Sequence, residues 1–264
     1  MTSSTSPTSS SSDRPDLVTG PPGQSGQQSP GGDRPREVAA SLAGVRARIT
    51  AAAEAAGRPG EDVTLVAITK TFPASDVRLL SSLGVRDVGE NRDQEAAPKA
   101  AACADLRDQL TWHFVGQLQT NKVSSVVRYA DVIHSVDRTR LVTALGAAAR
   151  KAGRTLTGLV QVSLDGDPGR GGAARADVPL IADAIAGEEG LELGGVMAVA
   201  PQGEEPLDAF RRLADIAAQV RAVHPGATVI SAGMSGDLEA AIGAGATHVR
   251  VGTALLGGRP GFVR

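Results

Sequence analysis

The sequence predicts an α/β protein that folds as a single (β/α)8 barrel of the TIM type, preceded by a disordered N-terminal tail. The chain has 264 residues, of which 41% are hydrophobic, and such a barrel takes about 250 residues. From about residue 63 onward, short apolar runs that are typical of buried strands alternate with segments of helical periodicity. Eight such runs occur, and eight parallel strands close a barrel. An open doubly wound sheet has the same alternation, so the strand count favours the barrel without excluding the sheet.

Residues 1–34 differ in composition from the rest of the chain. They are mostly Ser, Thr, Pro, Gly, Gln and Asp, and Leu17 and Val18 are their only sizeable aliphatic residues besides Met1. Such a segment cannot bury enough apolar surface to offset the entropy lost on ordering. We therefore expect residues 1–34 to be a disordered tail and residues 35–264 to form the barrel, with no second domain after it.

The elements of the barrel follow a first helix, in which apolar residues from Val38 to Ile49 recur at helical spacing before Gly57 and Pro59 end it. The apolar runs predict strands at residues 63–68, 85–88, 111–115, 131–136, 156–164, 191–199, 228–231 and 248–251. Between them, helices are expected at about residues 75–83, 90–106, 137–151, 177–186 and 206–223, and further helices begin near residues 121 and 235.

The composition argues against several classes of protein. The chain has 27 basic and 29 acidic residues, so it lacks the basic excess of a nucleic-acid-binding domain. Its single cysteine, Cys103, is incompatible with an intrachain disulfide framework or a cysteine-rich zinc site. No apolar run approaches the roughly 18 residues that span a membrane, and the N-terminus lacks the apolar core of a secretory signal. We expect a cytoplasmic protein that binds neither nucleic acid nor membranes.

The histidines do not indicate a metal site, because none of the four forms a pair at the i, i+4 spacing of helical metal ligands. His113 and His134 fall within the third and fourth expected strands, and we interpret both as hydrogen-bonded core residues. Residues 165–172 resemble a calcium or phosphate loop only superficially, and we interpret them as a flexible loop. No metal is expected.

Lys70 is the first candidate functional residue. It comes directly after the first apolar strand and Thr69, and it is one of only four lysines in the chain. Desolvation of an ammonium group is unfavourable, so a buried amine loses its proton more readily than an exposed one. Imine formation with an aldehyde requires the deprotonated amine. The alternative is a lysine whose stem covers the strand end while its ammonium group reaches solvent.

The loops after the seventh and eighth strands are candidates for a phosphate site, because barrels of this type often bind phosphate there. The first of these loops contains Gly233 and Ser235, and the second begins with Gly252 and Thr253. Glycine lets the backbone approach a ligand closely or adopt an unusual φ, and hydroxyl and amide groups bind phosphate oxygens. The alternative is that Ser235 or Asp237 only caps the short helix that follows.

Arg250 lies within the eighth expected strand. With a period of two, Val249 and Val251 share one face of that strand and Arg250 lies on the other. If the valines face the outer helices, Arg250 points into the barrel, where a cation needs a partner. A pyridine nitrogen or a carboxylate of a ligand would serve, and a buried salt bridge to Glu or Asp is the alternative.

Six motifs, in this order, resemble those of the pyridoxal-phosphate homeostasis proteins. They are Ile68-Thr69-Lys70-Thr71, Gly89-Glu90-Asn91, Trp112-His113-Phe114-Val115-Gly116-Gln117-Leu118-Gln119-Thr120-Asn121-Lys122, Ile133-His134-Ser135-Val136-Asp137, Gly233-Met234-Ser235-Gly236-Asp237 and Val249-Arg250-Val251-Gly252-Thr253. The resemblance covers about residues 36–258 and is specific, because all six motifs occur in order. It implies a barrel like the N-terminal domain of alanine racemase, with pyridoxal 5'-phosphate as the cofactor.

The resemblance also implies how the cofactor is bound. An imine would form on the lysine, the arginine would approach the pyridine nitrogen, and the asparagine would lie near the ring. The serine and the last glycine and threonine would hold the phosphate, with the backbone of the first glycine and the methionine nearby. The residues assigned in this way are Lys70, Asn91, Gly233, Met234, Ser235, Arg250, Gly252 and Thr253.

The chain departs from the usual family pattern in three places. Ala232 stands where methionine is common, and Ser163 stands where asparagine is common. Arg170-Gly171-Gly172 replaces a stretch that is more often Lys-Ser-Gly. The last departure weakens the case for a second cofactor-accepting lysine in that loop.

Two functions remain open at this point. The protein either binds pyridoxal phosphate and buffers it or delivers it to apo-enzymes without turnover, or it is a racemase-like enzyme that acts on amino acids. Alanine racemase takes a catalytic tyrosine from a second domain, whereas the single tyrosine here, Tyr129, is expected within the helix after the third strand. We therefore favour the carrier, without catalytic residues, and expect a monomer. A phosphosugar enzyme would explain the phosphate loops but not the other motifs.

Overall fold

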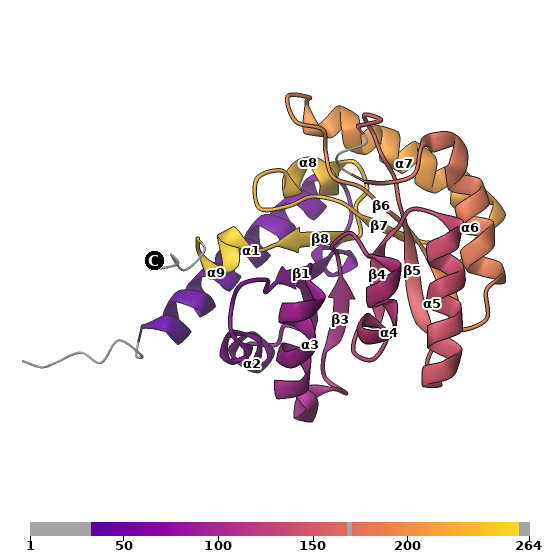
Figure 1. The fold of residues 1–264 in the computed structure, drawn as a ribbon. Helices are drawn as coiled ribbons and strands as arrows, with labels where there is room; N and C mark the ends of the chain where they lie inside the picture. Colours follow the sequence, from indigo (N-terminus) through magenta and orange to yellow (C-terminus); the bar gives the residue numbers. More distant parts are fainter. Residues whose placement is uncertain (1–32, 168–170, 259–264) are drawn as a thin grey trace, which may run out of the picture.

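The computed structural model describes residues 33–167 and 171–258, which form a closed barrel of eight parallel strands (Figure 1). Each strand pairs with the next along the chain, and the eighth returns to pair with the first, which confirms the barrel rather than the open sheet. The expected tail lies almost wholly outside the described residues. The strands are β1 (Thr64–Ile68), β2 (Asp87–Glu90), β3 (Thr111–Phe114), β4 (Val132–Val136), β5 (Leu156–Gln161), β6 (Leu191–Met197), β7 (Val229–Ser231) and β8 (His248–Val251).

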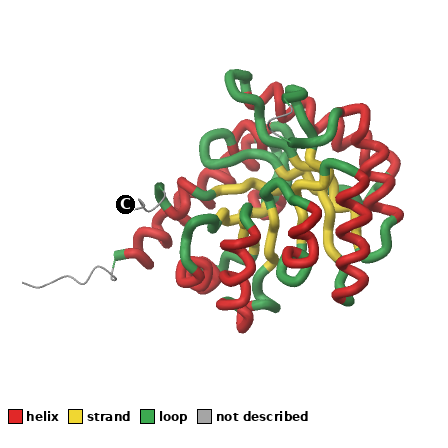
Figure 2. The backbone as a smooth tube through the Cα atoms, in the orientation of Figure 1, coloured by secondary structure: helices red, strands yellow, loops and turns green. Residues whose placement is uncertain are grey.

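Helices form a layer around the outside of the strands (Figure 2). The first of them precedes β1 and lies beside the last two (Figure 1). In the described ranges, no helix is long and apolar enough to cross a membrane. The α-helices are α1 (Arg34–Ala55), α2 (Ala74–Ser82), α3 (Asp93–Ala102), α4 (Val123–Val126), α5 (Thr139–Ala152), α6 (Val178–Gly187), α7 (Pro206–Val223), α8 (Leu238–Gly243) and α9 (Thr253–Leu256).

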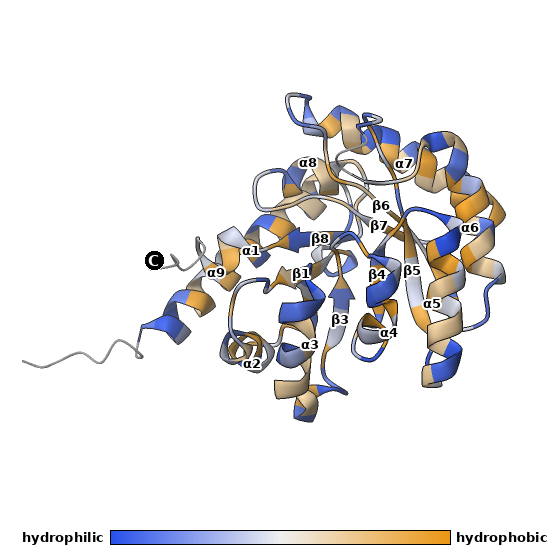
Figure 3. Ribbon diagram, in the orientation of Figure 1, coloured by the Kyte–Doolittle hydropathy of each residue, from blue (hydrophilic) through white to orange (hydrophobic). Residues whose placement is uncertain are grey.

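The core lies between the outer faces of the strands and the inner faces of the helices. In α5, Leu141, Leu145 and Ala149 are buried at a spacing of four residues, so one side of the helix packs on the barrel. The helices carry apolar and polar residues on different sides (Figure 3). On β8, Val249 and Val251 are fully buried in this outer core, and the residue between them therefore points into the barrel.

Several expected boundaries were wrong, for local reasons. The helix expected from residue 90 begins at Asp93, because Glu90 is still part of β2 and Arg92 has an extended backbone. The fifth strand was expected to reach residue 164, but it ends at Gln161, and Ser163 begins a turn in which its Oγ accepts a hydrogen bond from the Gly166 amide. The short helix α9 was not expected.

Tyr129 also differs from the expectation. It lies in the turn after α4 rather than within a helix, because α4 has only four residues. Its ring is 8% exposed and packs edge-on against Trp112. Tyr129 is therefore a core residue of the outer layer.

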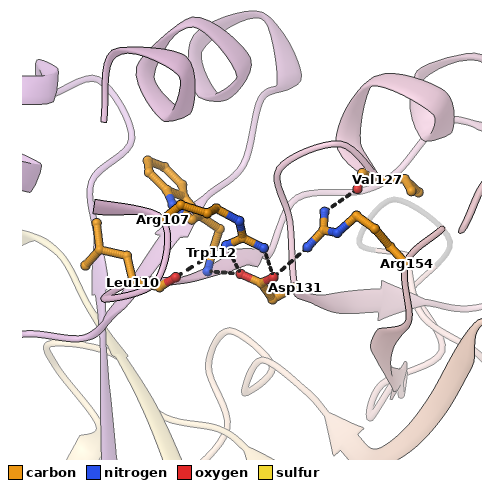
Figure 4. A network of polar contacts seen from close by, with 6 residues as sticks. All are labelled: Arg107, Leu110, Trp112, Val127, Asp131 and Arg154. Carbon is orange, nitrogen blue, oxygen red and sulfur yellow. Dashed lines mark hydrogen bonds and ion pairs between the residues drawn. The ribbon is translucent and has the colours of Figure 1, made fainter. Parts of the chain in front are cut away.

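A network around Asp131 joins β3, β4 and β5 at their N-terminal ends (Figure 4). The Asp131 carboxylate accepts hydrogen bonds from Arg107 Nη1 at 2.8 Å, from Arg154 Nη2 at 2.6 Å and from the Trp112 amide at 2.8 Å. Burial alone would raise the pKa of Asp131, but the hydrogen bonds from Arg107 and Trp112 outweigh it and hold the pKa below its ordinary value. The N-terminal ends of these three strands are thus held together by structural contacts.

Candidate functional site

A cavity of about 270 Å³ lies at the carboxyl ends of the strands. Seven of the eight residues predicted to bind the cofactor line it, and the exception is Gly233. These residues come from segments after β1, β2, β7 and β8, together with β8 itself. The seven are Lys70, Asn91, Met234, Ser235, Arg250, Gly252 and Thr253.

Lys70 presents an amine to this cavity. The residue is half-buried, and in the part of the chain that the structure describes its Nζ makes no hydrogen bond or ion pair. Lys99, by contrast, is buried in an ion pair with Glu90. Lys70 therefore lines the cavity, and its amine makes no hydrogen bond or ion pair with the described residues.

The turn that follows Lys70 is held by α3. Thr71 has a φ of 70°, a left-handed conformation that is unfavourable for a β-branched residue. The Thr71 amide donates a hydrogen bond to Glu95 Oε2 at 3.0 Å, and the Phe72 amide donates to the Thr69 carbonyl at 3.1 Å. These contacts keep the chain turned immediately after the lysine.

A buried ion pair holds the residue before Lys70. Lys99 Nζ donates to the Thr69 carbonyl at 2.7 Å and to Glu90 Oε1 at 2.5 Å. Thr69 Oγ1 also donates to Glu90 Oε1, at 2.5 Å. Burial raises the pKa of Glu90, although Lys99 and Thr69 act in the opposite direction. Residues of α3 thus fix the backbone on both sides of Lys70, a role that we did not predict for Glu90, Glu95 or Lys99.

The loop after β7 is tied to the start of α9. Ser235 Oγ accepts a hydrogen bond from the Ala254 amide at 3.3 Å, and the Ser235 carbonyl accepts one from Arg48 Nη2 at 3.0 Å. Asp237 Oδ1 accepts a hydrogen bond from the Met234 amide at 2.5 Å, and α8 has no side-chain cap. Neither Ser235 nor Asp237 therefore acts only as a cap of α8. The Ser235 hydroxyl lies between the two loops that were predicted to bind phosphate.

Gly233 serves the fold rather than the wall of the cavity. Its φ is 87°, and a Cβ at this position would lie 2.6 Å from the Ala241 side chain of α8. Its carbonyl accepts a hydrogen bond from the Arg250 amide at 2.9 Å. Glycine is thus required for the sharp turn after β7, which brings the next two residues of the loop to the cavity.

Arg250 is 5% exposed and points into the barrel, as predicted. Its Nη1 donates to Ser231 Oγ at 2.7 Å, and its Nη2 donates to the Ala198 carbonyl at 3.0 Å. Among the described residues no carboxylate lies within ion-pair distance of it, so the alternative of a buried salt bridge is wrong there. Burial lowers the pKa of Arg250 to about 10, and the guanidinium remains a cation at neutral pH.

The other lining residues were missed by the sequence analysis, which looked for polar groups. Ile68 and Val115 form apolar walls, and Gly116 is packed so tightly that a Cβ there would lie 2.1 Å from the Asn91 carbonyl oxygen. Ile68 could have been found, because it is two residues before Lys70 and so shares its face of the strand. The lining residues that were missed are Ile68, Val115, Gly116, Met197 and Val199.

No group of three His, Cys, Asp or Glu side chains in residues 33–167 and 171–258 is placed to hold a metal ion. His113 and His134 are hydrogen-bonded to each other at 2.8 Å in the core. The loop at residues 165–172 lies partly outside the described residues. The side-chain donors that do line the cavity are an amine, a guanidinium, an amide and two hydroxyls, which together fit a ligand with a carbonyl carbon, a ring acceptor and an anionic group.

Comparison with known proteins finds relatives that match nearly the whole barrel. The family model described as alanine racemase, N-terminal domain, matches residues 41–260. The pyridoxal phosphate homeostasis protein of Mycobacterium tuberculosis is 47% identical over 245 residues, which cover 86% of this chain and 95% of that protein. That of Escherichia coli is 37% identical over 227 residues, which cover 84% and 97%.

Solved structures agree with these relatives. PipY of Synechococcus elongatus, solved without pyridoxal phosphate, is 35% identical, has a TM-score of 0.75 and is matched over 83% of this chain and 100% of its own. A second structure of PipY, solved with pyridoxal phosphate bound, has a TM-score of 0.73. Alanine racemase of Corynebacterium glutamicum is only 13% identical, with a TM-score of 0.61, and shares the fold alone.

The contacts of Glu90 generate a first prediction. Lys99→Met leaves the buried carboxylate without its cation, which lowers the free energy of unfolding by about 3–5 kcal/mol. Loss of Lys99 also raises the pKa of Glu90 further, and a carboxyl whose pKa is raised by folding destabilises the protein as pH rises. The loss in free energy of unfolding relative to the wild type should therefore be smaller at pH 5 than at pH 8, as measured by urea denaturation followed by circular dichroism. Lys151→Met, at an exposed position of α5, is the control and should change stability by less than about 0.5 kcal/mol. Equal stability of the Lys99 variant and the wild type would contradict the role of the ion pair.

Proposed function

Because the chain belongs to the pyridoxal phosphate homeostasis proteins, whose barrel is that of the alanine racemase N-terminal domain, we propose that it binds pyridoxal 5'-phosphate as an imine on Lys70 and takes part in the homeostasis of this cofactor. The observation that carries the proposal is the unengaged amine of Lys70 in a cavity that also contains Arg250, Ser235 and Thr253. Bound pyridoxal phosphate would supply an aldehyde for reversible attachment and a ring that accepts electrons.

The attachment needs only an amine and an aldehyde. The deprotonated Nζ of Lys70 attacks the aldehyde carbon, a carbon–nitrogen double bond forms, and the aldehyde oxygen leaves as water. No oxidant or reductant takes part, and addition of water reverses the reaction. The half-buried position of Lys70 supports this reversibility, because water can reach the bond.

The polar groups around the lysine suit the rest of the cofactor. We expect the hydroxyls of Ser235 and Thr253, with the backbone at Gly252, to hold the phosphate, because all three residues line the cavity. We expect Arg250 to contact the pyridine nitrogen and Asn91 to contact the edge of the ring. An arginine at this position keeps the pyridine nitrogen unprotonated, and the ring is then a weaker electron acceptor.

A carrier fits these residues better than the alternative of a racemase-like enzyme. Two-base racemisation needs a second proton donor across the ring from the lysine. Among the described residues that line the cavity, no histidine, tyrosine or carboxylate is present. Tyr129 lies behind the barrel wall, beside a different cavity, between α3 and α4. Buffering of pyridoxal phosphate or its delivery to apo-enzymes by a cytoplasmic monomer, without substrate turnover, is therefore part of the proposal.

The proposed anchor predicts the outcome of borohydride reduction. After incubation with pyridoxal phosphate, reduction and peptide mass mapping, the wild type should carry a pyridoxyl-phosphate mass on the peptide that contains Lys70. Lys70→Ala should lose this mass and the imine absorption band but retain weaker binding through the phosphate. Lys151→Ala, at an exposed lysine, serves as the matched control and should behave as the wild type. Absence of any adduct on the wild type would refute the proposal.

The proposed phosphate site predicts a difference between two ligands. Thr253→Val, in which the hydroxyl is replaced by a methyl group, should weaken pyridoxal phosphate binding by about tenfold or more, because hydrogen bonds to charged groups contribute about 1.5–3 kcal/mol. Binding of pyridoxal, which has no phosphate, should hardly change. Titration followed by the imine absorbance measures both. An equal loss for the two ligands would place the phosphate elsewhere.

The carrier proposal predicts that the protein does not turn over amino acids but does transfer pyridoxal phosphate to an apo-enzyme. The loaded protein should racemise or deaminate amino acids no faster than free pyridoxal phosphate does. When mixed with an apo-aminotransferase, it should restore that enzyme's activity as its own imine band disappears. Racemisation that is abolished by Lys70→Ala would instead support the enzyme alternative.

A further inference from the structure

A chain of polar side chains crosses the interior of the barrel below the cavity. Four of its members are buried, namely His113, His134, Ser231 and Arg250. The fifth, Asp87, has a side chain that is 22% exposed and opens β2 at the N-terminal end of the barrel. The five residues belong to five different strands, from β2 to β8.

Four short contacts link these residues in a single line. Arg250 Nη1 lies 2.7 Å from Ser231 Oγ, which lies 3.0 Å from His134 Nδ1. His134 Nε2 lies 2.8 Å from His113 Nδ1, and His113 Nε2 lies 2.9 Å from Asp87 Oδ1. The line therefore begins at a guanidinium that lines the cavity and ends at a carboxylate near the opposite end of the barrel.

The chemistry of the two end groups determines which atom donates each hydrogen bond in the line. A guanidinium only donates hydrogen bonds, an ionised carboxylate only accepts them, and a neutral imidazole does one of each. If both histidines are neutral with the proton on Nε2, every member donates to the next, from Arg250 to Asp87. Each polar atom in the line then has a partner of the correct type.

The opposite direction would leave a buried group unsatisfied. Ser231 Oγ would accept from both Arg250 and His134, and its own proton would have no acceptor within the described parts of the chain. Ser231 is fully buried, where an unpaired hydroxyl is unfavourable. Burial, and then the nearby His113 and Arg250, hold the pKa of His134 well below its usual range, which agrees with a neutral ring.

We propose that Ser231, His134, His113 and Asp87 are positioning residues, which hold the Arg250 guanidinium in place at the cavity through two neutral Nε2–H histidines. The second anchor of the guanidinium, from Nη2 to the Ala198 carbonyl at 3.0 Å, lies outside this line. With two of its five N–H groups engaged in this way, Arg250 keeps others for a ligand. The effect of these hydrogen bonds on pyridoxal phosphate binding rests on the function proposed above. The direction in which they donate, from Arg250 to Asp87, is a property of the protein alone.

The direction is tested first on the protein without added cofactor. Long-range proton–nitrogen correlation spectra of 15N-labelled protein distinguish the two neutral tautomers of each histidine from the cation. His113 and His134 should both give the Nε2–H pattern at pH 7. An Nδ1–H tautomer or a cation at either residue would overturn the proposal.

The effect on the site is tested with matched variants and pyridoxal phosphate. Ser231→Ala should raise the dissociation constant by about tenfold, and Ser231→Thr, which keeps a hydroxyl, should restore part of the loss. Asp87→Ala, at the far end of the line, should weaken binding several-fold and abolish the tautomer preference of His113. Asp87→Asn keeps an acceptor oxygen but adds an amide donor, so it should restore only part of the loss.

The outcomes separate this proposal from the previous one. If the wild type forms no adduct on Lys70, the proposed function fails, while the spectra without cofactor still decide the direction of the line. If the wild type binds normally and both Ser231→Ala and Asp87→Ala bind equally well, the positioning role is refuted. Because Asp87 is partly exposed, its variants keep the test valid even if Ser231→Ala does not fold.

Discussion

The cavity depends on the pairing of β8 with β1, which closes the barrel. In this pairing Val66 lies opposite Arg250 and Ala67 lies opposite Val251. The register places the end of the first strand, which leads to Lys70, beside the end of the last strand. In an open sheet the strands would end in a row, and the doubly wound order would not bring these two segments together. Closure thus brings the amine of Lys70 to the loops that we propose to bind phosphate, which are far from it in the sequence.

Within the described residues, the buried cations Lys99 and Arg250 are stabilised in different ways. Lys99 is paired with a carboxylate behind the barrel wall, and the pair fixes the backbone before Lys70. The hydrogen bonds of Arg250 go to a hydroxyl and a carbonyl, both uncharged, and Asp237 acts on its charge only from beyond ion-pair distance. The guanidinium is therefore less fully compensated at the cavity, where a ligand acceptor would meet it, than the ammonium group of Lys99.

Local patterns in the sequence favoured the barrel and indicated several residues of the cavity wall, whereas Asn91 and Met234 were assigned only through the resemblance to the homeostasis proteins. Apolar runs and strand ends can be read from neighbouring residues, and the period of two placed Arg250 inside the barrel. The ion pair of Lys99 could not be read in this way. It depends on how α3 packs against β2, which buries Lys99 beside Glu90, and neighbouring residues in the sequence do not reveal that packing. The left-handed Thr71 likewise has no signature in its residue type.

Gly233 shows a different limit of the sequence analysis. A glycine in a candidate phosphate loop was interpreted as allowing either close approach to a ligand or an unusual φ, and the structure shows the second, because the turn has a positive φ and α8 leaves no space for a side chain. A residue can therefore be essential to a site without lining it. The same holds for Glu95 and Lys99, whose contacts act on the backbone around Lys70.

These backbone contacts bear on the proposed role, in which the protein binds and releases pyridoxal phosphate. The strained turn at Thr71 is held by Glu95, and the preceding residue is held by Lys99, without help from any ligand. The backbone on both sides of Lys70 is thus held before binding, so little ordering of this backbone has to accompany attachment. Lys70 itself is only partly buried, so an imine formed there, as proposed, would be open to water, which reverses its formation. Preorganisation favours capture and solvent access favours release, and a carrier needs both, whereas an enzyme that protects a reactive intermediate needs water to be excluded.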